Sequence, residues 1–137
     1  MALFDSPAAY GTAALAVLYF HFAVVLFNVF WLLAVPAGGW LGWRFVRNYW
    51  WRAAHIAALI LVAAQAAAGR LCFLTIVQNY LQTRAGGISP SLITRIVMRA
   101  IYWPLPDWVF APLYLLALVC AALLWKYVPP RRTNQPA

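Results

Sequence analysis

Three long apolar runs dominate the pattern of hydrophobic and polar positions along the chain. Residues 10–35 read YGTAALAVLYFHFAVVLFNVFWLLAV and contain no charged side chain. At ~1.5 Å of helical rise per residue this run exceeds the ~30 Å hydrocarbon core of a bilayer, so it can cross with some tilt. The run 53–69 is shorter and rich in alanine, and it ends there or continues to about residue 77. With the run 108–127, the pattern predicts three transmembrane helices.

A different pattern separates the second and third runs. The segment SLITRIVMRAIYW, at about 91–102, places Arg95 and Arg99 four positions apart, with apolar residues elsewhere on the helical wheel. Two arginines near the middle of a span would each cost about 2.5 to 3.5 kcal/mol on insertion scales, so we expect an amphipathic helix in the membrane interface. Asp107 is the expected N-cap of the last helix. The predicted fold class is an all-α integral membrane protein, with one domain over residues 1–137.

Composition supports a membrane protein and restricts its chemistry. Of all residues, 66% are hydrophobic and 9% are charged, against roughly 25% charged in soluble domains. The chain has no glutamate, and its two carboxylates are Asp5 and Asp107. Sequence patterns typical of a P-loop, a zinc protease or a serine hydrolase are missing. We therefore expect no catalytic residues, no metal site and no enzyme activity. Cys72 and Cys120 are expected to lie at different depths, ~20 Å apart, too far for a disulfide.

The net charge of +8 raises the alternative of a nucleic-acid-binding protein. The basic residues are spread through the stretches between the apolar runs, which favours lipid phosphate over nucleic acid as the partner. We expect lipid headgroups to contact Arg44, Arg47, Arg52, Arg95 and Arg99.

Orientation is predicted from the basic residues on each side of the membrane. The first loop and the tail share one side and hold six basic residues, whereas the second loop holds four. The count favours an external N-terminus and a cytoplasmic C-terminus. The six are Arg44, Arg47, Arg52, Lys126, Arg131 and Arg132, and the four are Arg70, Arg84, Arg95 and Arg99.

Polar side chains within the apolar runs usually face the interior of a helix bundle. His21 and Asn28 align with Tyr10 on one helix face, and Gln65 aligns with Cys72 on the next helix. One interpretation is that these faces meet and form interhelical hydrogen bonds. The alternative is a ligand such as haem b, a quinone or a lipid held by the histidines at positions 21 and 55. Their heights in the two runs differ by ~12 Å, which counts against a shared iron.

Several residues together resemble a known family. The pattern comprises Gln65, Gly69, Cys72, Leu74 and Thr75, followed by an AGG turn, PDWVFAPLY and VPPRR. It is similar to small bacterial inner-membrane proteins grouped as the domain of unknown function 2784 family, and the likeness runs from about residue 21 to residue 132. The resemblance implies a bacterial inner-membrane location but no activity.

The family's hallmark after the second helix is Cys-Pro-Leu-Thr followed three residues on by Glu. Here Phe73 stands at the proline position and Gln78 at the glutamate position. The resemblance also implies that His21 and His55 are the counterparts of histidines in the family's first two helices. The polar residues expected where the second helix leaves the bilayer are Cys72, Thr75, Gln78 and Asn79.

The function expected from these features is that of a non-catalytic accessory or scaffold subunit in a membrane complex or homo-oligomer. Its expected partners are membrane lipids and other membrane subunits, with no nucleic acid. The small side chains of Ala54, Ala58, Ala64 and Ala68 would let a neighbouring helix approach closely. The alternative function is binding of a cofactor or lipid at His21 and His55.

Overall fold

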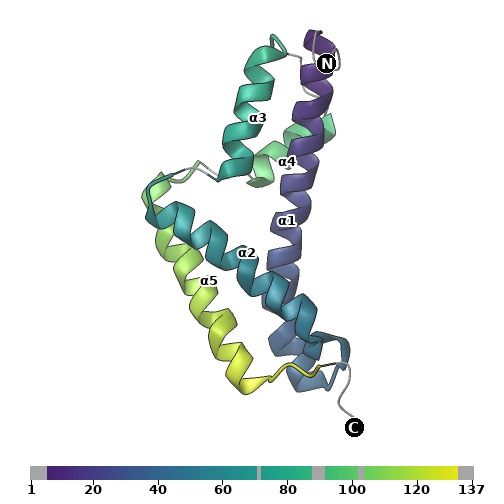
Figure 1. Ribbon diagram of the computed structural model, residues 1–137, viewed down its shortest axis with the longest axis vertical. Coiled ribbons are helices and arrows are strands. Elements are labelled where there is room, and N and C mark those ends of the chain that lie inside the picture. The colour runs from purple at the N-terminus through teal and green to yellow at the C-terminus, as the bar shows by residue number, and fades with distance from the viewer. Residues whose placement is uncertain (1–5, 71, 88–91, 102–103, 133–137) are drawn as a thin grey trace. The chain divides into compact units, whose positions relative to one another are not determined.

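A computed structural model describes residues 6–70, 72–87, 92–101 and 104–132. Over these ranges the protein is helical and has no β-strand, which confirms the predicted all-α class (Figure 1). Three helices are long and apolar enough to cross a membrane, over Pro7–Leu41, Tyr49–Ala67 and Trp108–Tyr127. The elements are α1 (Pro7–Leu41), the short 3₁₀ helix η2 (Phe45–Arg47), α2 (Tyr49–Ala67), α3 (Phe73–Arg84), α4 (Leu92–Ile101) and α5 (Asp107–Tyr127).

The chain forms two compact units. Unit 1 comprises Met1–Val25 and Leu71–Leu105, and unit 2 comprises Leu26–Arg70 and Pro106–Ala137. Helix α1 contributes its first part to unit 1 and its second part to unit 2.

Helix α1 is longer than its apolar run predicted. Its 35 residues extend for ~52 Å. Even at a tilt of about 40°, the upper end of the usual range, it would project over ~40 Å, which is the thickness of a bilayer with its headgroup layers. Both ends of α1 would therefore reach headgroup depth in a membrane.

The turn between α1 and α2 is built from local backbone and capping contacts. Gly42 has a φ of 75°, a left-handed conformation that glycine adopts without strain and that ends α1. The Asn48 side chain then accepts a hydrogen bond from the Trp50 amide at 3.1 Å and caps α2. Because of this cap, α2 begins at Tyr49, four residues before the predicted start at residue 53.

The second helix ends at Ala67 and does not continue to residue 77. Gly69 has a φ of 66°, which turns the chain, and a separate helix, α3, begins at Phe73. Cys72 is the residue that precedes this helix, and its side chain makes no capping bond. The sequence pattern of apolar residues on both sides of the glycine did not distinguish one long helix from two.

The start of α5 differs from the prediction, whereas the amphipathic helix before it is present. Pro106, and not Asp107, occupies the N-cap position of α5, and its carbonyl accepts from the Val109 amide at 2.9 Å. The predicted amphipathic helix is present as α4, while residues 91 and 102 at its expected ends lie outside the described residues. Arg95 and Arg99 are exposed, as the amphipathic pattern requires.

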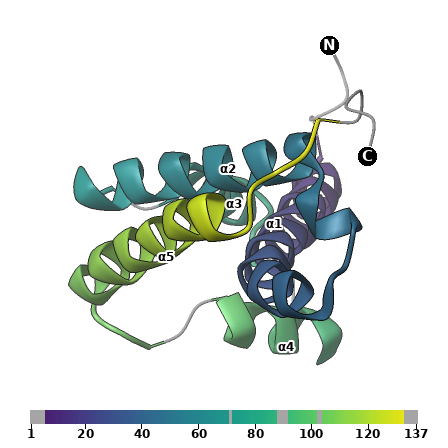
Figure 2. The same ribbon diagram turned by 90° about the horizontal axis from the view of Figure 1, so that it is seen from below.

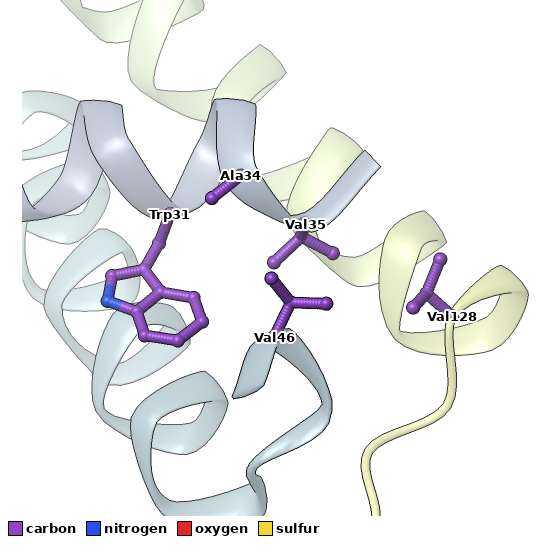
Figure 3. Close-up of a cluster of buried hydrophobic side chains, with 5 residues drawn as sticks. All are labelled: Trp31, Ala34, Val35, Val46 and Val128. Carbon is purple, nitrogen blue, oxygen red and sulfur yellow. The ribbon is translucent and has the colours of Figure 1, made fainter. Parts of the chain in front are cut away.

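In unit 2, α2 and α5 lie side by side in both views (Figures 1 and 2). A small apolar core forms where α1 ends, the η2 turn passes and α5 ends (Figure 3). Val46 is fully buried in it. Glycine at position 38 of α1 leaves room for Val46, because a Cβ added at Gly38 would lie 2.6 Å from the Val46 side chain. The core comprises Trp31, Ala34, Val35, Val46 and Val128, flanked by Phe27 and Leu124.

Candidate functional site

The most unusual side chain in unit 2 is Arg52, which is only 2% exposed. Its Nη1 donates a hydrogen bond of 2.6 Å to the carbonyl of Val128, the residue that caps α5. Its guanidinium carbon lies 5.4 Å from the ring centroid of Trp125. The positive charge is thus placed against a helix C-terminus, where carbonyl groups carry partial negative charge, and against an aromatic face. Arg52 was expected to contact lipid headgroups, but the structure turns it into the interior.

The segment after α5 folds back along the turn that precedes α2. The Arg131 amide donates to the Arg47 carbonyl at 2.6 Å, and Asn48 and Arg131 form an isolated parallel bridge. The guanidinium of Arg132 lies 5.1 Å from the centroid of the Tyr49 ring. These contacts join residues about eighty positions apart and hold several arginines at one end of unit 2.

The other arginines expected at lipid headgroups remain accessible. Arg44, Arg95 and Arg99 are exposed, and Arg47 is half-buried. Arg131 and Arg132 entered the sequence-based predictions only through the orientation count and not as contact residues. The terminal PPRR motif was visible, but nothing local indicated that it returns to the first turn.

His55 is a second buried polar residue of unit 2, with 2% of its surface exposed. Its ring meets Phe27 edge to face at 6.3 Å, and one ring nitrogen hydrogen-bonds to the backbone of Asn28. Nε2 is buried and has no hydrogen-bond partner among the described residues, so Nδ1 makes that bond. An Nδ1–H bond to a backbone carbonyl leaves the Nε2 lone pair directed away from it, as in many ligand-binding histidines.

His21 lies in unit 1 and is 7% exposed. Its Nδ1 is buried without a hydrogen-bond partner in the part of the chain that the structure describes. The two histidines thus belong to different units.

Unit 1 has a polar interior that contains the hallmark positions of the sequence pattern. Thr75 and Gln78, one turn apart on α3, are 8% and 2% exposed. Cys72 is half-buried, whereas Asn79 is exposed. The inward face of α3 therefore carries the threonine and the glutamine of the motif, in the same unit as the buried His21.

The remaining polar candidates are less deeply placed. Asn28 and Gln65 are half-buried. Both Cys72 and Cys120 are free thiols. Within the described ranges, no group of three or more histidine, cysteine or acidic side chains is arranged to hold a metal ion.

These features define a class: a small helical protein with three helices long and apolar enough for a membrane, and with buried polar residues on α1, α2 and α3. The chain matches the family described as "Protein of Unknown function (DUF2784)" over residues 12–130 and belongs to that family. The match confirms the resemblance drawn from the motif residues. No curated protein and no solved structure shows significant similarity to the chain.

Proposed function

We propose that this protein is a non-catalytic accessory or scaffold subunit of a complex in the bacterial inner membrane. The observation that carries the proposal is the exposed apolar surface of its longest helices. In the most apolar window of α5, only 6% of the residues are buried within the chain. Leu115, Leu116 and Leu123 are each more than half exposed. Such a surface needs lipid or another subunit around it.

Helix α2 offers the face on which a neighbour could pack. Ala54, Ala64 and Ala68 are exposed, and small side chains allow two backbones to approach closely in lipid. The neighbour is a second copy of the chain or another membrane subunit. The scarcity of carboxylates supports a role without catalysis, and the basic residues support an external N-terminus with a cytoplasmic C-terminus.

The test is extraction in mild detergent followed by native mass measurement of the full chain. We expect an assembly larger than the monomer. Ala64→Leu should dissociate it, because the added side chain blocks close approach on α2. Ala100→Leu is the matched control, since it adds the same atoms at an exposed position of α4, outside the three long apolar helices. A monodisperse wild-type monomer with no co-purifying protein would contradict the proposal.

A second candidate function is binding of a haem b, a quinone or a lipid by the buried histidines. It is favoured by His55, whose Nδ1 is held by the backbone of Asn28 while its buried Nε2 has no partner among the described residues. This arrangement fixes the tautomer in which Nε2 accepts a hydrogen bond or a metal.

The absorption spectrum of the purified protein tests this candidate. Haem would give a Soret band that is lost in His55→Ala, and organic extraction followed by mass spectrometry would detect a quinone. Asn79→Ala, at an exposed polar residue of α3, is the control and should retain any ligand. A colourless protein from which no quinone or stoichiometric lipid is recovered would leave the subunit role as the one supported.

A further inference from the structure

One end of unit 2 carries a concentration of positive charge that neither proposed function uses. We propose that this end binds the headgroup of an anionic phospholipid. This end, the basic corner, comprises Arg44, Arg47, Arg52, Lys126, Arg131 and Arg132.

Among the described residues of unit 2, no carboxylate side chain lies near the basic corner. The one carboxylate in the sequence of unit 2 is Asp107, which begins α5, whereas Lys126 lies in the last turn of that helix. The helical rise between them is ~28 Å, well beyond the ~8 Å over which physiological salt screens charges. Only Arg52 is turned inward, and the other five side chains are exposed or half-buried. An anion at this end would therefore relieve repulsion among accessible cations.

Backbone contacts hold the corner together. The 2.6 Å hydrogen bond from the Arg131 amide to the Arg47 carbonyl fixes the tail against the turn before α2. Arg132 is held over the ring of Tyr49. Arginines from the two chain segments of unit 2 are thus brought together by the fold. The guanidinium group offers several N–H donors in a planar fork, which suits the oxygens of a phosphate group.

Exposed aromatic side chains at the ends of the long helices favour a lipid as the source of the phosphate. Trp40, in the last turn of α1, is 89% exposed, and Trp50, in the first turn of α2, is 74% exposed. Tyr127, the last residue of α5, is also 74% exposed. Tryptophan and tyrosine at the ends of spanning helices favour the depth of lipid headgroups. The inference rests on the membrane placement proposed above and does not depend on the accessory role.

The experiment is a lipid titration of the full chain in a non-ionic detergent, followed by native mass spectrometry. Phosphatidylglycerol and phosphatidylcholine with the same acyl chains are the two probes. We expect phosphatidylglycerol to bind at least tenfold more tightly. In Arg131→Gln/Arg132→Gln its affinity should fall about 25-fold, because each basic residue near an anionic surface contributes about fivefold. The matched control, Arg70→Gln/Arg84→Gln, removes the same charge at two exposed positions outside the basic corner and should change the affinity less than threefold.

Three results would overturn the proposal. Equal binding of the two lipids would show that the headgroup charge does not contribute to the affinity. Equal losses in the two double variants would show attraction by net charge alone, and displacement of the lipid by millimolar inorganic phosphate would show a site for free anions. If the tail variant loses helical circular dichroism, Arg44→Gln takes its place, with an expected loss of about fivefold. A monomer that still selects phosphatidylglycerol would refute the subunit role and support the lipid site.

Discussion

The interior position of Arg52 leads to a prediction about stability that separates its contacts from the cost of burying it. A hydrogen bond from a charged donor contributes about 1.5 to 3 kcal/mol net, and a desolvated cation–π contact contributes about 2 kcal/mol. The bond to the Val128 carbonyl is 2.6 Å long, and the Trp125 centroid is 5.4 Å from the guanidinium carbon. The cost of desolvating the buried ion offsets part of their sum of ~4 kcal/mol. We therefore expect Arg52→Met to lower the free energy of unfolding by only about 1 to 3 kcal/mol.

A double-mutant cycle measures the contact between Arg52 and Trp125 itself. The cost of desolvating Arg52 is paid both with and without Trp125, and it therefore cancels. Arg52→Met, Trp125→Leu and the double variant would be unfolded by sodium dodecyl sulfate in mixed micelles and followed by circular dichroism. We expect a coupling energy of about 1 to 2 kcal/mol between the two positions. Arg44→Met, at an exposed position, should change stability by less than about 0.5 kcal/mol. A coupling energy within error of zero would refute the view that Trp125 stabilises the buried charge.

Two further predictions concern topology and packing. The first is tested by single cysteines introduced at positions 6, 42 and 83, with the native cysteines replaced, and labelled in intact cells. We expect positions 6 and 83 to lie on one side of the membrane and position 42 on the other. Labelling of all three from one side would contradict three spans. Gly38→Ala should destabilise the protein by about 1 to 2 kcal/mol, although alanine favours helices, because its Cβ would meet the fully buried Val46 at 2.6 Å. Its thermal unfolding in detergent checks this, and a more stable variant would show that Val46 can move aside.

Much of the fold was predictable because its determinants are local. A long uncharged apolar run must satisfy its backbone within itself in a membrane, and a helix does so. The runs at 10–35, 53–69 and 108–127 therefore identified α1, α2 and α5. The four-residue spacing of Arg95 and Arg99 likewise identified α4. The helix boundaries were less accurate, because the Asn48 cap and the Gly69 turn decide them.

The candidate sites were predictable only in part. The sequence pattern predicted an interior position for His21 and His55, and both are buried. It did not indicate that they belong to different units, or that Thr75 and Gln78 lie on a separate helix. Residue spacing describes one face of one helix, and it carries no information about which other helix covers that face.

By itself, the sequence determined the helical class, the three long apolar helices and the family, since hydrophobicity and periodicity act over one helix at a time. Only the tertiary structure decided that Arg52 points inward while Arg131 and Arg132 return to the first turn. An arginine beside tryptophans gives the same sequence signal whether it reaches lipid phosphate or a buried carbonyl. The choice depends on a partner, Val128, that lies 76 residues away along the chain and is brought near only when α2 and α5 pack together.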